Sequence, residues 1–259
     1  MRLTILGRSP ARPNPGEACA GYLLEGGKTR ILMDIGPGVV AQLLLRTTPD
    51  ELDAVVVSHM HTDHFLDLVT LRYSYPWVEH ADRKLRVVVP PGSRAQLEQV
   101  ALGAGYPDFF DRSFIFEEHD GTGPIEIGDL RLEPHATKHF VPTWGFRAEA
   151  RGAGEDAGRI FAYSADSAPT PSLDALADSA DLFLCESALR LRTDDPPDDA
   201  SRGHLLPCEA GETASRAGVK RMVLTHLPTS NGGEWAQREA ASTFQGRVEV
   251  AEILRSYDI

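Results

Sequence analysis

The feature that most constrains this chain is a cluster of metal-binding side chains directly after an apolar run. Residues 53–58 read DAVVVS, which has the length and continuous apolar character of a strand buried on both faces. The next six residues, HMHTDH, place three histidines and one aspartate between His59 and His64. Imidazole suits zinc, and a carboxylate adds an oxygen ligand and a proton acceptor. A loop at a strand end can turn these side chains toward one point, so the pattern predicts a metal site.

Composition places this segment in an ordinary globular chain. Of the 259 residues, 42% are hydrophobic and 25% are charged, which is enough apolar material for a core. No apolar run approaches the roughly 20 residues that span a bilayer, and the opening MRLTILGRSPARP lacks the long apolar stretch of a secretory signal. Cys19, Cys185 and Cys208 form no CxxC pair, which favours a reduced protein without disulfides. We therefore expect a cytoplasmic protein with no membrane partner.

Strand and helix patterns alternate along the chain and predict an α/β (α+β) fold. The predicted strands are residues 2–6, 21–24, 30–35, 53–58, 85–89, 114–117, 125–127, 130–134, 144–150, 159–164, 181–185, 221–225 and, as the last one, 247–251. The predicted helices are residues 39–45, 64–73, 93–102, 173–179, 208–217 and 234–243. Hairpins followed by strand–helix alternation occur twice, which predicts a single domain over residues 1–259 made of two similar halves, with helices outside two packed sheets. The acidic, proline-rich segment 192–201 is predicted to be an exposed loop.

Further metal-competent residues follow later predicted strands. His226 ends the apolar strand RMVLT, and Asp166 follows the strand IFAYSA. A strand end can deliver such a side chain to the edge of a sheet, where a metal could be held. The segment EPHATKHF offers two more candidates, His135 and His139, and the residues alone leave that choice open.

With these residues the chain resembles the metallo-β-lactamase superfamily, whose hallmark is the H-x-H-x-D-H loop. The likeness extends to the turn LMDIG at residues 32–36 and to the single ligand candidates after it. It implies a four-layer αβ/βα sandwich of two mixed sheets flanked by helices, with the metal site at one edge of the sheets. It also implies two divalent ions, zinc in the first place and manganese or iron as alternatives. The implied ligands are His59, His61 and a later histidine for one ion, Asp63, His64 and His226 for the other, and Asp166 between them.

Members of the ribonuclease Z type carry the third histidine a few residues before a Gly-aromatic-Arg strand. Here that strand is WGFR at residues 144–147, and the register favours His139 over His135. This branch also has a histidine outside the metal ligands that faces the substrate phosphate, which His204 in RGHLL matches. His204 would act in catalysis with Asp63, and Glu186 would orient it.

The remaining candidates are expected to play smaller parts. Asp34, at the tight turn that ends a predicted strand, is expected to support the ligands from outside or to fix that turn, and not to bind metal. His80 and His119 lie in polar stretches and are placed on the surface.

Two adjacent ions can supply a hydroxide nucleophile and a clamp for a phosphodiester, a lactone or a thioester. His204 and the WGFR strand favour a phosphodiesterase that acts on a small molecule such as a cyclic nucleotide. A lactone, thioester or other ester hydrolase is the alternative, ahead of an RNA-processing nuclease or a metal-free binding protein.

The net charge of −12 makes structured nucleic acid a poor partner. Only 27 positions separate His139 from Asp166, which leaves no room for the tRNA-binding arm of ribonuclease Z. Members of the family that the chain resembles are often dimers, and this resemblance is the only basis for expecting a homodimer.

Overall fold

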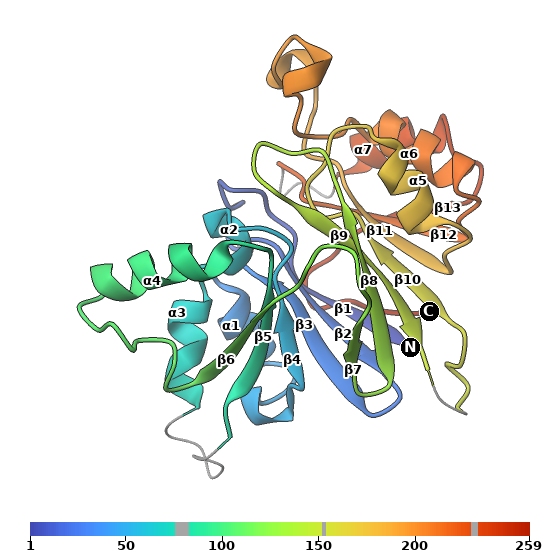
Figure 1. The fold of residues 1–259 in the computed structure, drawn as a ribbon. Helices are drawn as coiled ribbons and strands as arrows, with labels where there is room; N and C mark the ends of the chain where they lie inside the picture. Colours follow the sequence, from blue (N-terminus) through green and yellow to red (C-terminus); the bar gives the residue numbers. More distant parts are fainter. Residues whose placement is uncertain (76–82, 152–153, 229–232) are drawn as a thin grey trace.

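Two mixed seven-stranded sheets face each other, with helices on their outer sides (Figure 1). The computed structural model describes residues 1–75, 83–151, 154–228 and 233–259. The strand order is β14-β1-β2-β3-β4-β5-β6 in the first sheet and β13-β12-β11-β10-β9-β8-β7 in the second. Each sheet joins an antiparallel part, β14 to β3 or β7 to β10, to a parallel part, β3 to β6 or β10 to β13. This is the predicted α/β sandwich.

The strands agree closely with the apolar patterns in the sequence. In the first sheet they are β1 Arg2–Gly7, β2 Gly21–Gly26, β3 Thr29–Ile35, β4 Ala54–Val56, β5 Leu85–Val89, β6 Phe114–Glu118 and β14 Ser256–Asp258. In the second sheet they are β7 Ile125–Ile127, β8 Leu130–Ala136, β9 Trp144–Ala150, β10 Ile160–Tyr163, β11 Leu182–Glu186, β12 Arg221–Thr225 and β13 Arg247–Val250. The predicted last strand is therefore not the last: β14 follows it and returns to the first sheet, where it pairs antiparallel with β1.

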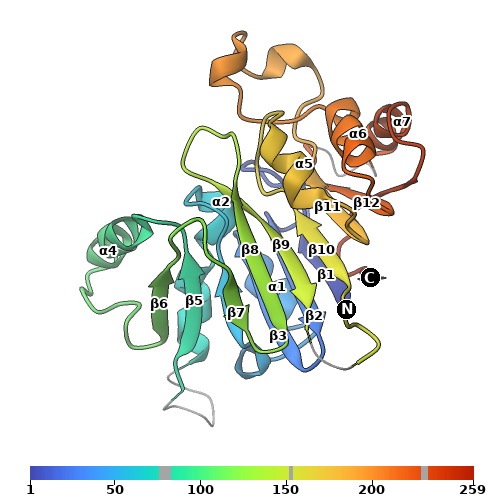
Figure 2. The same cartoon turned by 45° about the vertical axis from the view of Figure 1, so that its right-hand side comes forward.

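Helices α1 to α4 cover the first sheet and α5 to α7 cover the second, as the turned view also shows (Figure 2). The α-helices are α1 Val39–Leu43, α2 Thr62–Phe65, α3 Leu68–Leu71, α4 Ser93–Gly103, α5 Pro171–Ala177, α6 Pro207–Arg216 and α7 Glu234–Ala241. Short 3₁₀ turns are η1 Pro49–Glu51, η2 Arg72–Ser74, η3 Arg192–Asp194 and η4 Asp199–Ser201. Among the described residues, no helix combines the length and the apolar character needed to cross a bilayer.

Three apolar layers hold these four layers of structure together. The central layer lies between the sheets and takes residues from both, such as Tyr22 and Met33 from one and Phe146 and Leu184 from the other. A second layer packs under α1 to α4, and a third packs under α5 to α7. Strands buried on both sides explain why the segments around β4 and β11 are continuously apolar.

The predicted helix over residues 64–73 is broken into α2, α3 and the turn η2. Asp67 lies at the break. Its backbone N–H donates to the Ile35 carbonyl (3.0 Å), and its carboxylate accepts from the Val40 N–H (2.9 Å). These contacts tie the segment to the end of β3 and to α1, and the first of them takes the place of a helical hydrogen bond. The helix α2 itself begins at Thr62, so Asp63 and His64 lie within its single turn.

Candidate metal centre

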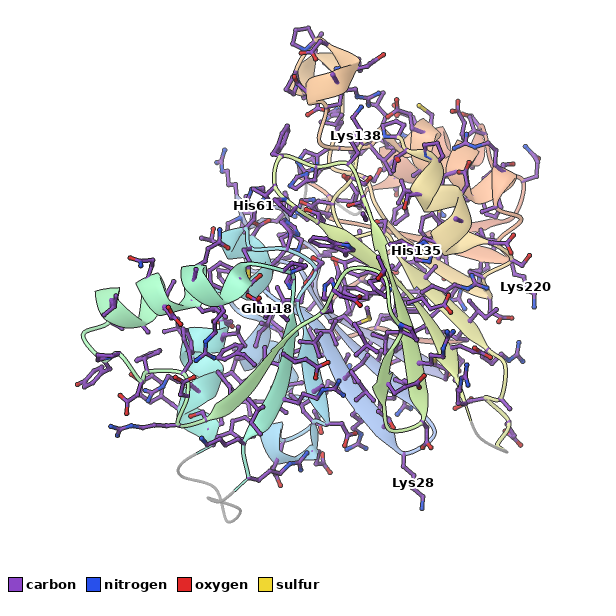
Figure 3. The ribbon with its side chains drawn as sticks, in the orientation of Figure 1. Lys28, His61, Glu118, His135, Lys138 and Lys220 are labelled. Atoms are coloured by element: carbon purple, nitrogen blue, oxygen red, sulfur yellow. The ribbon has the colours of Figure 1, made fainter. Side chains whose placement is uncertain are left out.

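The candidate ligands gather at one edge of the two sheets, where several parallel strands end. The segment after β4 supplies His59 to His64, and the segments after β10 and β12 supply Asp166 and His226. His139 comes from the loop between β8 and β9. Because parallel strands in one sheet present their carboxyl ends at the same edge, residues distant in sequence meet there. Figure 3 shows His61 at this edge and Lys28 at the opposite end of the molecule.

The first group of side chains consists of three histidines and Asp166. The Nδ1 atom of His61 lies 3.1 Å from Nε2 of His59 and 3.0 Å from Nε2 of His139. Oδ2 of Asp166 is 3.8 Å from Nε2 of His59 and 3.7 Å from Nε2 of His139. At zinc–nitrogen distances of about 2.0–2.1 Å, two nitrogens on one tetrahedral ion lie about 3.3 Å apart. The spacing of these atoms therefore suits a single ion between them.

The second group is more deeply buried and shares Asp166 with the first. Nε2 of His64 lies 3.4 Å from Oδ2 of Asp63 and 3.4 Å from Oδ1 of Asp166. Nε2 of His226 lies 3.3 Å from Oδ2 of Asp63 and 3.6 Å from Oδ2 of Asp166. Oδ1 of Asp166 thus faces the second group, and Oδ2 lies near members of both groups. A carboxylate in this position can bridge two ions.

Hydrogen bonds on the far side of the imidazoles decide which nitrogen faces the centre. Ser58 Oγ donates to Asp34 and so accepts from Nδ1 of His59 (3.0 Å). Nδ1 of His64 donates to Asp34 Oδ2 (2.8 Å), and Nδ1 of His139 donates to the Gly203 carbonyl (2.8 Å). With the proton held on Nδ1, each of these three rings directs the lone pair of Nε2 inward. Asp34 therefore supports two candidate ligands from outside, which is one of the two roles expected of it.

The donor set fits a metal ion because two of its inward atoms lack a hydrogen-bond partner among the described residues. Nε2 of His64 and Oδ1 of Asp166 are buried, and among the described residues neither has a hydrogen-bond partner. Buried polar atoms without partners cost free energy, and a cation between them would satisfy both. Imidazole nitrogens with carboxylate oxygens are a ligand set that zinc and related divalent ions accept.

The electrostatics of the site also favour a cation. Burial holds the pKa of His59 well below its usual value, and it lowers the pKa of His61 and His139, so these rings stay neutral and able to bind metal. Burial alone would raise the pKa of Asp166, but the nearby imidazoles of His226 and His64 outweigh it and hold that pKa well below its ordinary value. The same neighbours lower the pKa of Asp63.

His64 is the exception among these histidines. Burial opposes its charged form, but the carboxylates of Asp166 and Asp34 outweigh burial and raise its pKa well above the usual value. A bound cation would take the place of that proton.

Backbone strain is concentrated at the same edge. Asp34, Ala165 and His226 each have a positive φ, of 56°, 51° and 56°, a conformation that costs a non-glycine residue about 1–2 kcal/mol. Each lies near the end of a strand, where the chain turns beside the site. Gly36 allows the turn after β3 to approach the ligand loop, because a Cβ there would lie 1.8 Å from the carbonyl oxygen of Asp63.

His204 lies beside both groups. Its Nδ1 donates to Oε1 of the buried Glu186 (3.0 Å), so Glu186 is placed to orient it. The His204 ring centroid is 4.9 Å from that of His139 and 5.7 Å from that of His226. Burial disfavours its charged form, but Glu186 outweighs this effect and raises the pKa of His204 to about 9. Glu186 also accepts from the backbone of Ser167 (3.0 Å), which lies next to Asp166.

The loop that carries His204 contains a residue whose role the sequence did not reveal. Asp195 belongs to the segment 192–201, for which the sequence predicts an exposed loop. Asp195 is nevertheless only 7% exposed. Its carboxylate accepts from the Gly203 N–H (3.0 Å), next to His204. The exposed-loop prediction is therefore wrong for this residue, and only the composition of the segment, which is acidic and proline-rich, could have drawn attention to it. The segment as a whole projects from the top of the molecule in Figure 1.

The other histidines lie outside the two groups. His135, on β8, shares no metal-competent cluster with the other described residues, and Figure 3 shows it on its strand away from His61. His119 was expected on the surface but is only 5% exposed, so that prediction is wrong. Its ring, just after β6, packs edge-on against Trp144 at the start of β9 (centroids 5.1 Å apart). His80 lies outside the described residues.

Two facing mixed sheets with His/Asp groups at their common edge define a metallohydrolase of the αβ/βα sandwich type. The chain belongs to the metallo-β-lactamase superfamily: the profile described as "Beta-lactamase superfamily domain" matches residues 29–227. An uncharacterized protein of Mycobacterium tuberculosis is 30% identical over 100% of this chain and 92% of its own length. Ribonuclease Z of Mycobacterium bovis is 30% identical over 100% of this chain and 98% of its own length. The crystal structure of the metallo-β-lactamase fold protein YhfI from Bacillus subtilis matches with a TM-score of 0.85 and 25% identity, covering 99% of this chain and 98% of that one.

Proposed function

We propose that the protein is a dinuclear metal-dependent phosphodiesterase that acts on a small phosphodiester, such as a cyclic nucleotide. The observation that carries this proposal is the place of His204. It belongs to neither of the two ligand groups, although it forms a further cluster with Glu186 and His226, and it lies against His139 and His226 with Nδ1 engaged by Glu186. This position would let it contact a bound oxyanion. A phosphodiester needs charge stabilisation and a proton for its leaving oxygen, and an imidazolium at this position serves both needs.

The two groups would hold one divalent ion each, zinc in the first place, with Asp166 between them. Divalent ions in such sites supply a water-derived nucleophile at neutral pH and neutralise charge on a bound oxyanion. The protein would do the rest. Asp63, whose Oδ2 lies near His64 and His226, would take a proton from the attacking water. His204 would give a proton to the leaving oxygen on the other side, while Glu186 keeps its ring in place.

Several features support a small substrate over structured RNA, although one relative is a ribonuclease Z. The interval between His139 and Asp166 contains β9 and β10, which pair antiparallel, so the described part of that interval forms a hairpin and no long arm. The acidic segment 192–201 projects beside the same edge, and the chain carries a net charge of −12. Negative charge near the site opposes a polyanion, whose binding depends on neutralising many phosphates.

The test combines metal analysis with one substitution. Protein purified without chelators should contain close to two transition-metal ions per chain. His204→Ala should keep both ions but lower phosphodiester turnover by about 10²–10⁴-fold, the usual scale for a lost general acid or charge stabiliser. The loss should be largest for leaving groups of high pKa, which need protonation, and smaller for nitrophenolate. His135→Ala, a histidine away from both groups, is the matched control and should behave like wild type.

Three results would contradict the proposal. Loss of metal in His204→Ala would place this residue among the ligands. A loss of activity that does not depend on the leaving group would argue against proton donation. A wide preference of the wild-type protein for lactones or thioesters would replace the phosphodiesterase by an ester hydrolase of the same fold.

A further inference from the structure

One aromatic ring stands exposed at the rim of the candidate metal centre. Phe140 follows His139 directly and is 52% exposed, although apolar rings usually avoid water. Its ring centroid lies 4.9 Å from that of His139 and 5.6 Å from that of His204. The other large apolar side chains that are highly exposed among the described residues have no ring contact with the histidines of the site.

The Phe140 ring is supported by the backbone of Gly203. A Cβ at Gly203 would lie 2.4–2.8 Å from three atoms of the Phe140 ring, so the ring rests directly on the Gly203 backbone. That backbone is itself fixed at both polar atoms. Its N–H donates to Asp195 (3.0 Å), and its carbonyl accepts from Nδ1 of His139 (2.8 Å). An exposed ring with a fixed support needs little ordering when a ligand packs on it, which favours binding.

We propose that Phe140 is a stacking platform for a planar aromatic group of the substrate, such as a nucleobase. This inference rests on the proposed function and narrows its substrate class to phosphodiesters that carry such a group. A phosphate beside His204 would lie one ring contact away from Phe140, and a sugar can bridge the distance from that phosphate to a base over the ring. Offset or edge-on aromatic pairs form at centroid separations of about 4.5–7 Å, and a base packed on Phe140 would lie at such a distance from its ring. Stacking tolerates any base, because every base offers a π face.

The experiment compares two ligands that share a phosphate and a ribose. Adenosine 5′-monophosphate and ribose 5-phosphate are titrated calorimetrically into the metal-loaded protein and into Phe140→Ala, Phe140→Leu and Phe140→Trp. The wild type should bind the nucleotide about 5–150-fold more tightly than the sugar phosphate, which is the range expected for one stacked base. Phe140→Ala and Phe140→Leu should lose most of this preference, and Phe140→Trp should keep it. Affinity for ribose 5-phosphate and metal content should stay within about twofold in all four proteins.

A control variant and the opposing results make the test decisive. Tyr106→Ala removes another exposed ring, 59% exposed and stacked on Phe109, and should leave both affinities unchanged. If Phe140→Leu keeps the preference, the contact is merely apolar and the platform is refuted. The platform is also refuted if the wild type hydrolyses diesters but binds adenosine 5′-monophosphate no more tightly than ribose 5-phosphate. If the wild type hydrolyses no diester and still shows a preference that depends on Phe140, the proposed reaction fails while the platform stands.

Discussion

Replacing Asp34 by asparagine should weaken metal binding and destabilise the fold together. The fully buried carboxylate accepts four hydrogen bonds. Oδ1 accepts from the Ser58 N–H (2.7 Å), and Oδ2 accepts from Ser58 Oγ (2.8 Å), His64 Nδ1 (2.8 Å) and the Tyr163 hydroxyl (2.6 Å). An asparagine side chain has one oxygen and one NH₂ group, so in either orientation the NH₂ group faces at least one donor.

The magnitude follows from the less costly orientation. The amide oxygen would keep the three donors that now face Oδ2, and the Ser58 N–H would be left without an acceptor. One buried N–H without a partner costs about 1–3 kcal/mol, and the bonds that remain lose the strengthening from the carboxylate charge. We therefore expect the free energy of unfolding to fall by about 2–4 kcal/mol. Metal affinity should fall by about 10–100-fold, the usual effect of losing the partner of a ligand histidine.

Two measurements check this expectation separately. Urea unfolding of chelator-treated protein gives the stability, and equilibrium dialysis with elemental analysis gives the metal affinity. Tyr163→Phe is the matched control, because it removes one neutral donor and leaves the carboxylate in place; it should cost at most about 1.5 kcal/mol and change metal affinity less than Asp34→Asn does. The reasoning is refuted if Asp34→Asn binds metal and unfolds like the wild type, or if Tyr163→Phe weakens metal binding equally.

Two further predictions concern the third ligand and the pH dependence of stability. His139→Ala should lower metal content and activity together while His135→Ala changes both much less, and elemental analysis with turnover assays would expose the opposite order. Burial opposes ionisation of Asp181, but Lys220 (2.7 Å) and the Ile160 N–H (2.9 Å) outweigh it and lower its pKa. Such a carboxylate stabilises the fold above its unfolded pKa of about 3.9, and this stabilisation disappears as pH falls through the lower folded pKa. The stability deficit of Asp181→Asn in urea unfolding should therefore be full at pH 7 and shrink below about pH 4, whereas a deficit independent of pH would show that the charge is not its cause.

The sequence alone was enough to predict most elements of the fold, because their signals are local. Continuous apolar runs mark strands such as β4 and β11, which are buried on both faces. The regular spacing of small and apolar residues marks α6, which buries Pro207, Ala210 and Ala214 on one face. The prediction failed where a distant contact decides the outcome: the helix after His64 is broken by the hydrogen bond from Asp67 to the end of β3, and β14 forms because it pairs with β1.

The metal-binding chemistry of the site could also be predicted from a local signal, the residue types and spacing of the HMHTDH segment. What the sequence could not show is how atoms from β3, β4, β10 and β12 meet at one edge, since that depends on sheet order and packing. Only the folded chain places Asp34 behind two candidate ligand histidines, Asp195 under the His204 loop and Phe140 on the backbone of Gly203. Residue type and local spacing determine which atoms can bind a metal or a base. The packing of two sheets determines which of those atoms come close enough to act together, because hydrogen bonds and metal coordination operate only over a few ångströms.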